Sequence, residues 1–273
     1  MLLTEKYLRM NKMPHIWCPG CGNGIVLQAI IRAVDELQLS KDNTVFVSGI
    51  GCSSRAPGYL DFNTLHTTHG RALAFATGVK VAKPDLNVIV IMGDGDATAI
   101  GGNHFIHAAR RNIDLTAIVF NNSIYGMTGG QYSPLTPTGS KATTCPYGNI
   151  ERNFDIANLA IAAGATYVGR STTYHAKMLS DLIVKAVQNK GFSLVEAITA
   201  CPIGYGRKNK MGSPVKMMQA QKENSVMIKA AAKMRPEELT GKTIIGELYN
   251  QAAPEFCEQY EKMLSIFHER RNS

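Results

Sequence analysis

Two polar motifs in this sequence have the residue types of a magnesium and phosphate site. Gly93-Asp94-Gly95-Asp96 follows one apolar run, and Asn121-Asn122 follows the next, 27 residues beyond Asp94. Glycines let backbone N–H groups approach a phosphate, and an aspartate beside a phosphate needs a cation between them. Mg²⁺ binds carboxylate, amide, carbonyl and phosphate oxygens. Asp94, Asn122 and the Ile124 carbonyl are therefore candidate magnesium ligands, although Gly-Asp-Gly alone also fits an ordinary strand-end turn.

The six cysteines include a single C-x-x-C motif, Cys18-Pro-Gly-Cys21. This spacing is typical of zinc sites, iron–sulfur sites and redox dithiols. A thioredoxin-like dithiol needs no further cysteine, and a zinc ribbon usually has a second C-x-x-C motif, which this chain lacks. Cys52 and Cys201 each follow an expected strand, so four thiolates could converge on a 4Fe-4S cluster. Spacing alone leaves iron–sulfur and zinc equally open, and Cys145 and Cys257 are expected to be ordinary thiols.

Apolar runs alternate with segments of helical periodicity along residues 23–199, which predicts an α/β fold with a mostly parallel sheet and helices on both faces. Strands are expected over 44–50, 87–92, 115–120, 165–169 and 192–199, and helices over 23–39, 71–82, 103–111, 156–163 and 175–188. Ligands of such sheets bind outside the carboxyl ends of the strands. The four polar clusters that follow strands should then lie along one edge: 49–53, 93–96, 121–122 and 201–202.

Two stretches lack this alternation. Residues 126–149 are rich in Gly, Ser, Thr and Pro without a period, and loops of that length are usually functional. Residues 204–213 form a basic linker, followed by helix-compatible segments within 214–232 and 241–270. We therefore expect an α/β domain over 1–203, with an N-terminal cluster-binding segment, and a basic C-terminal extension over 204–273.

The composition is that of a globular protein, with 273 residues, 45% hydrophobic and 18% charged. It excludes disordered, collagen-like and coiled-coil chains. No apolar stretch approaches the ~20 residues that span a bilayer, and the charged, polar residues 1–11 predict no signal peptide. We expect a cytoplasmic protein without a membrane partner.

The net charge of +8 is concentrated between residues 201 and 235, which contain eight Lys and Arg residues and one Glu. A local excess of this kind attracts anionic partners. Interleaved stacking aromatics, typical of nucleic-acid modules, are missing, so we expect no nucleic-acid partner. A solvated face, an acidic protein and a phosphate-bearing cosubstrate remain open.

The Gly-Asp-Gly and Asn-Asn pair resembles the thiamine-diphosphate fingerprint. The fuller text GDGDATAIGGNHFIHAARRNIDLTAIVFNNSIYGMTGGQYSPLTP is similar to the β subunit of 2-oxoacid:ferredoxin oxidoreductases, above all the 2-oxoglutarate branch, and the likeness covers residues 17–206. It implies the thiamine-diphosphate-binding fold and these sites: Asp94, Asn122 and Ile124 for Mg²⁺; Gly95, Asp96, Gly126 and Met127 for the diphosphate; Ile50, Gly51, Cys52 and Ser53 for the cofactor loop; His69 beside the diphosphate; and Cys18, Cys21, Cys52 and Cys201 for one 4Fe-4S cluster.

The resemblance also implies a reaction. It is the coenzyme A-dependent oxidative decarboxylation of 2-oxoglutarate to succinyl-CoA and CO₂, with electrons passing through the cluster to ferredoxin, or the reverse. Pyruvate or branched-chain 2-oxoacids are the alternative substrates. Cys52, His69 and Arg55 are the expected catalytic residues. Our hypothesis for Arg55 is that its guanidinium binds the distal carboxylate of a dicarboxylic substrate, with a surface or phosphate-facing arginine as the alternative.

The resemblance further implies a separate α subunit that supplies the pyrimidine-binding domain. The chain alone is then expected to be inactive and to work in a dimer of αβ heterodimers. Two rival functions stay open. One is a thiamine-dependent decarboxylase subunit with zinc at the cysteines, and the other is an electron-transfer subunit that has lost thiamine binding.

Overall fold

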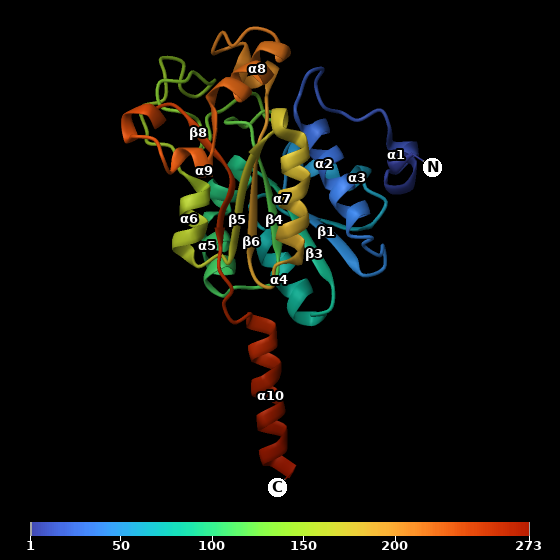
Figure 1. The fold of residues 1–273 in the computed structure, drawn as a ribbon. Helices are drawn as coiled ribbons and strands as arrows, with labels where there is room; N and C mark the ends of the chain where they lie inside the picture. Colours follow the sequence, from blue (N-terminus) through green and yellow to red (C-terminus); the bar gives the residue numbers. More distant parts are fainter. Residues whose placement is uncertain (1, 273) are drawn as a thin grey trace.

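The computed structural model describes residues 2–272. Its strands are β1 (Thr44–Ser48), β2 (Asn63–His66), β3 (Asn87–Gly93), β4 (Thr116–Asn121), β5 (Tyr167–Thr172), β6 (Ser193–Ile198), β7 (Ser225–Met227) and β8 (Thr243–Asn250). They form one sheet in the order β2-β1-β3-β4-β6-β5-β8-β7 (Figure 1). Pairing is parallel from β2 through to β5, and β8 then lies antiparallel to β5. The predicted mostly parallel α/β fold is therefore confirmed.

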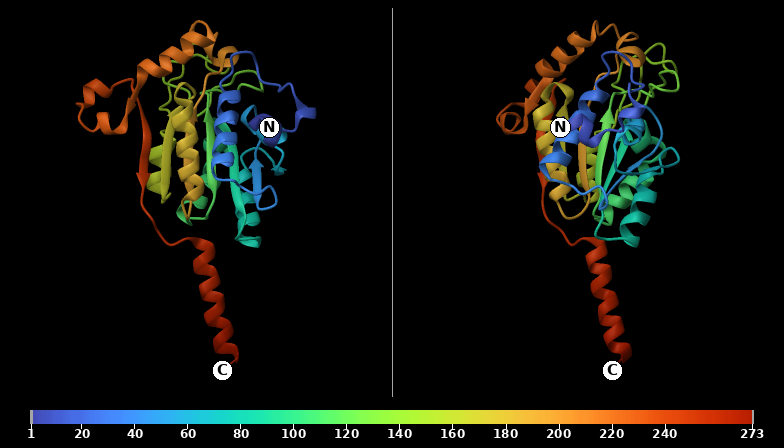
Figure 2. Two further views of the ribbon diagram at one scale, coloured as in Figure 1. Left: turned by 45° about the vertical axis from the view of Figure 1, so that its right-hand side comes forward. Right: turned by 90° about the vertical axis from the view of Figure 1, so that its right-hand side faces the viewer.

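Helices cover both faces of the sheet because the central strands are apolar on both sides. Phe46, Ile91 and Phe120 point into one core, which packs against α2 (Asn23–Glu36) and α7 (Ala176–Gln188). The alternate residues of the same strands point into a second core. That core packs against α4 (Ala72–Ala82), α5 (Gly102–Arg110) and α6 (Ile156–Ala163), on the opposite side in Figure 2.

The remaining α-helices are short or peripheral: α1 (Leu3–Tyr7), α3 (Ala56–Tyr59), α8 (Pro214–Asn224), α9 (Ile228–Ala231) and α10 (Phe256–Asn272). Among residues 2–272, no helix combines the length and the apolar character needed to cross a membrane. α10 projects away from the sheet, at the end opposite to α8 (Figures 1 and 2).

Some predicted elements differ from the structure. β5 begins at Tyr167, two residues after the predicted start, and β2 and β7 were not predicted. The expectation of helix-compatible sequence over 241–270 is correct for α10 but wrong for Thr243–Asn250, which forms β8. Strand formation there depends on pairing with β5, about 75 residues earlier, and local propensity does not reveal such a partner. Part of the predicted extension thus belongs to the sheet, and the boundary at residue 203 stays a prediction.

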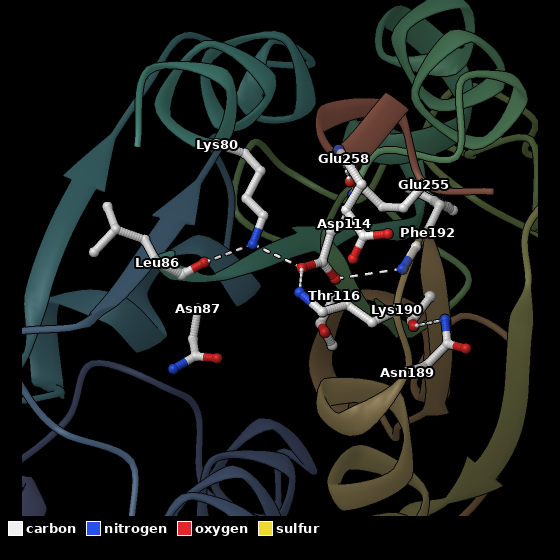
Figure 3. A network of polar contacts seen from close by, with 12 residues as sticks. Lys80, Leu86, Asn87, Asp114, Thr116, Asn189, Lys190, Phe192, Glu255 and Glu258 are labelled. Atoms are coloured by element: carbon white, nitrogen blue, oxygen red, sulfur yellow. Dashed lines mark hydrogen bonds and ion pairs between the residues drawn. The ribbon is translucent and has the colours of Figure 1, made fainter. Parts of the chain in front are cut away.

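A buried polar network fixes the start of α10 to the amino-terminal ends of the strands (Figure 3). The Lys80 amine donates to the Leu86 carbonyl at 2.8 Å and pairs with the Asp114 carboxylate at 2.7 Å. The Asp114 backbone N–H donates to Glu255 at 3.0 Å, and the Glu258 N–H donates to the other oxygen of Glu255 at 2.9 Å. Glu255 therefore caps the first turn of α10 and ties it to the residues before β4.

We predict that Lys80→Ala lowers the free energy of unfolding by about 2 kcal/mol or more, because it removes the nearer and buried cation of the half-buried Asp114 carboxylate and leaves Lys190, at 3.4 Å. Urea unfolding followed by circular dichroism measures this change. The matched control is Lys177→Ala, since Lys177 pairs with Asp181 at 2.8 Å on the exposed surface. That variant should change stability by about 0.5 kcal/mol or less. Equal losses in the two variants would contradict the role given to the buried pair.

Candidate functional site

The parallel pairing of β1, β3, β4 and β6 brings the ends of these strands to one edge of the sheet. Ser48 pairs with Ile91, Gly93 with Phe120, and Asn121 with Ile198. The strands are neighbours and run in the same direction. The four polar clusters that follow them are therefore on one edge, as the sequence predicted.

A cavity of about 210 Å³ opens at this edge. Its lining contains all the predicted cofactor-binding residues and all three predicted magnesium ligands: Ile50, Gly51, Cys52, Ser53, His69, Asp94, Gly95, Asp96, Asn122, Ile124, Gly126 and Met127. Phe120, Tyr125 and Thr128 complete much of the wall, and the sequence did not predict them. The structure thus brings the predicted set together, while the role of each residue stays a prediction.

Asp94 is one of two buried carboxylates that line this cavity, with 3% of its surface exposed. Burial raises the pKa of its carboxyl to about 7, and the hydrogen bond from the Ser133 hydroxyl opposes that shift. Backbone N–H groups of Asp94 and Gly95 oppose the shift as well. A buried carboxylate of this kind favours a cation next to it. Ser133 belongs to the long irregular stretch 126–149, so this loop contacts the site, although no motif marks Ser133 in the sequence.

The turn after β4 presents two further oxygens. Ser123 has a left-handed backbone with φ 62°, and its N–H donates to the Asn121 side-chain oxygen at 3.1 Å. The Ile124 N–H donates to the Asn122 side-chain oxygen at 3.2 Å. Amide and carbonyl oxygens each have two lone pairs, so Asn122 and Ile124 still have acceptor capacity. Together with Asp94, they form an all-oxygen donor set that suits Mg²⁺.

Asp96 is 2% exposed and joins two loops. Its carboxylate accepts from the Gly70 N–H at 2.6 Å and from the Ile50 N–H at 3.5 Å, and it pairs with His69 Nδ1 at 2.7 Å. The side chain predicted to bind a diphosphate therefore mainly fixes the loops that hold Ile50 and His69 against the cavity.

Tyr125 closes the cavity next to Gly95. Its hydroxyl donates to the Gly95 carbonyl at 3.1 Å, and its ring centre is 5.9 Å from that of His69. A Cβ atom at Gly95 would lie 2.2 Å from the Tyr125 ring, so only glycine allows this close approach. A tyrosine in a loop without a motif gives no sequence signal for such a role.

A second cavity, of about 400 Å³, is lined by Cys18, Cys21, Cys52 and Cys201. Burial raises the pKa of the Cys21 thiol to about 12 and that of Cys52 to about 11. Such thiols ionise when a metal coordinates them. Gly126 leaves room beside the sulfurs, because a Cβ atom there would lie 3.5 Å from Cys201 Sγ and 3.7 Å from Cys52 Sγ.

Within the described residues 2–272, no three His, Cys, Asp or Glu side chains form a group that could hold one metal ion. The thiols line a common cavity without forming such a group. In a cubane cluster each thiolate binds a different iron, so cluster ligands stand further apart than the ligands of a single ion. The choice between a cluster and zinc at these thiols stays a prediction of the sequence.

The two cavities are adjacent, since both are lined by Cys52, Asn122, Gly126 and Met127. Cys52 is also held by Trp17, which lines the thiol cavity and whose indole N–H donates to the Cys52 carbonyl at 2.6 Å. One loop thus lines both the cavity of the predicted cofactor residues and the cavity of the four thiols.

One predicted site residue, Arg55, lies outside both cavities, and so do the two cysteines that were expected to be ordinary thiols. Arg55 is exposed and outside the lining of both cavities, although it lies close enough to act on the charge of Cys52. Cys145 is half-buried in the long loop. Cys257 is buried in the first turn of α10, at the end of the sheet opposite to the site. The structure does not bring Cys145 or Cys257 into the thiol quartet.

Comparison with known proteins identifies relatives of this chain. Residues 49–197 match a family model described as "Thiamine pyrophosphate enzyme, C-terminal TPP binding domain". The chain is 54% identical over 259 residues to 2-oxoglutarate synthase subunit KorB of Methanocaldococcus jannaschii, covering 95% of this chain and 96% of the relative. It is 56% identical to the subunit of the same name from Archaeoglobus fulgidus, covering 94% and 92%.

The fold also matches a solved structure, the 2-oxoglutarate:ferredoxin oxidoreductase from Magnetococcus marinus with 2-oxoglutarate, coenzyme A and succinyl-CoA bound. The TM-score is 0.86 at 35% identity, covering 97% of this chain and 90% of that chain. The match therefore includes the whole sheet and not the binding edge alone.

We predict that Gly95→Ala weakens thiamine diphosphate binding by about tenfold or more, because the new methyl group would displace Tyr125 from the cavity wall. Calorimetric titration measures the affinity. Gly102→Ala is the control, since a Cβ atom there meets no atom within 4 Å. Unchanged affinity in Gly95→Ala would show that the contact between Gly95 and Tyr125 does not shape the site.

Proposed function

This chain belongs to the β subunits of the 2-oxoacid:ferredoxin oxidoreductases, a family of thiamine pyrophosphate enzymes, and we propose that it catalyses the oxidative decarboxylation of 2-oxoglutarate with an α subunit. The products would be CO₂ and succinyl-CoA, and the reverse reaction is the same chemistry. The observation that carries the proposal is the pair of adjacent cavities, one lined by the predicted cofactor residues and one by four thiols.

Thiamine diphosphate, when bound, supplies the carbanion stabilisation that allows a 2-oxoacid to lose CO₂. In this chain Asp94, Asn122 and the Ile124 carbonyl would hold Mg²⁺ against the diphosphate. Backbone groups around Gly95 and Gly126 would bind the phosphate oxygens, since both glycines line the cavity. The contact with Asp96 would fix the position of the His69 imidazole beside the phosphate oxygens.

A 4Fe-4S cluster is the group that we assign to the four cysteines. Cys52 would bring the cluster next to the cofactor, because its loop lines both cavities. Electrons would leave through the cluster to ferredoxin, and Cys18 is the exposed member of the quartet. The basic segment 201–235 begins at a proposed cluster ligand and carries eight cations against one anion, so it suits an acidic ferredoxin or the α subunit.

The remaining partners follow from the same proposal. The α subunit would supply the pyrimidine-binding domain, and the assembly would be a dimer of αβ heterodimers. The relatives are named as subunits, and the similar solved structure is named with coenzyme A and 2-oxoglutarate bound. A cytoplasmic location stays a prediction of the sequence.

Coenzyme A-dependent ferredoxin reduction, assayed anaerobically with a panel of 2-oxoacids and the co-purified α subunit, tests the proposal. We expect the highest kcat/KM with 2-oxoglutarate and no turnover by the isolated chain. Arg55→Ala should raise KM for 2-oxoglutarate about tenfold or more, through loss of a charged hydrogen bond, and should leave KM for pyruvate nearly unchanged. Preference for pyruvate or a branched-chain acid would overturn the substrate assignment. Equal effects of Arg55→Ala on both acids would remove its specificity role.

Iron analysis and visible absorption test the cluster. We predict that the wild-type protein is brown and that Cys18→Ser loses most of its iron, because a proposed ligand is removed. Cys145→Ser is the control and should keep its iron, since Cys145 is not among the residues that line the thiol cavity. A colourless protein that contains zinc would favour the decarboxylase alternative. A brown protein without affinity for thiamine diphosphate would favour the electron-transfer alternative.

A further inference from the structure

A buried carboxylate lies directly behind the turn that carries two of the proposed magnesium ligands. Glu196 is on β6 and is 3% exposed. One of its oxygens accepts from Arg170 Nε at 2.6 Å, and the other accepts from Asn121 Nδ2 at 2.7 Å. Arg170 also pairs with Asp155, which accepts from the first N–H groups of α6. Glu196 is thus held on one side and holds Asn121 on the other.

These contacts fix which way the Asn121 amide faces. Because its nitrogen donates to Glu196, its oxygen is directed at the Ser123 N–H, at 3.1 Å. That bond holds Ser123 at φ 62°, a conformation that is uncommon outside glycine. From the other side, the Thr136 hydroxyl donates to the Ser123 carbonyl at 2.7 Å. The turn therefore has its shape set by side chains on both sides.

We propose that Glu196 is a positioning residue for the metal site. It orients Asn121, which in turn sets the turn that presents the Asn122 side chain and the Ile124 carbonyl. The inference rests on the proposed function, because it assumes that these oxygens bind Mg²⁺ with thiamine diphosphate. Glu196 lines neither of the two cavities of the site, so it acts through Asn121 and not by contact with a ligand.

Only a carboxylate satisfies both neighbours of Glu196. Arg170 and Asn121 each donate, and an ionised carboxylate accepts at both oxygens. Glutamine would place its NH₂ group against one of these donors, and turning Asn121 to relieve that conflict would place the Asn121 NH₂ group against the Ser123 N–H. Exchange of the two functional groups restores the pattern. In Asn121→Asp with Glu196→Gln, the new aspartate accepts from Ser123 and from the glutamine amide, whose oxygen accepts from Arg170.

A double-mutant cycle tests the proposal in the purified complex with the α subunit. Calorimetry measures the affinity for thiamine diphosphate at a series of MgCl₂ concentrations, and thermal unfolding is recorded for each variant. We expect Glu196→Gln and Asn121→Asp each to raise the half-saturating Mg²⁺ concentration about 10- to 100-fold, as loss of an outer-shell contact does. The double variant should return to within about threefold of the wild type, since the two changes are coupled.

Charge alone gives a different result. Asn121→Asp adds a negative charge near the metal site, so a purely electrostatic effect would tighten Mg²⁺ binding in that variant. Glu196→Asp keeps the charge but shortens the side chain, and it should raise the Mg²⁺ requirement as well. Glu196→Asp also tests the proposal if one of the other single variants does not fold. The control is Glu247→Gln, which removes the charge of a carboxylate paired with Lys185 at 2.9 Å, on β8.

The outcomes separate the proposal from simpler explanations. Tighter Mg²⁺ binding in Asn121→Asp, wild-type affinity in Glu196→Asp, or a double variant as impaired as the sum of the singles would overturn it. Lower melting temperatures with unchanged Mg²⁺ dependence would show that the role is structural only, and this too overturns it. If the wild type shows no Mg²⁺-dependent binding of thiamine diphosphate, the proposed function itself fails.

Discussion

Parallel pairing of apolar strands is the constraint on which this molecule depends. β1, β3, β4 and β6 are buried on both faces, so their side chains are used for packing and only their ends are free for chemistry. Because the strands are neighbours with one direction, the residues that follow them meet at one edge. The opposite end of the sheet has a structural task, where the pair of Lys80 and Asp114 and the cap by Glu255 hold α10.

Three buried carboxylates near the site differ in how they are compensated, and this difference assigns their tasks. Glu196 pairs with Arg170 and accepts from Asn121, and Asp96 pairs with His69 and accepts from Gly70. Asp94 accepts from the Ser133 hydroxyl and faces the cavity. Burial of a charge without a cation is unfavourable, so Asp94, for which residues 2–272 provide no ion pair, is the carboxylate expected to bind a metal ion. The other two hold loops in place.

Close backbone approach connects the two cavities. Gly126 lies beside the sulfurs of Cys52 and Cys201 and also lines the cofactor cavity. A side chain at this position would fill space that both cavities share. The two cavities thus meet at a residue without a side chain.

The sequence by itself determined the α/β fold and the edge on which the polar clusters lie, because buried strands and glycine turns are local patterns. The C-x-x-C spacing and the family resemblance indicated many, but not all, of the residues that line the two cavities. The sequence also indicated the family, which the comparisons confirm. Only the tertiary structure decided that Tyr125 packs on Gly95, that Ser133 reaches Asp94, that Glu196 orients Asn121, that Thr243–Asn250 forms a strand and that Arg55 is exposed. Each of these depends on contacts between residues far apart in the chain, and a local pattern contains no record of its distant partner.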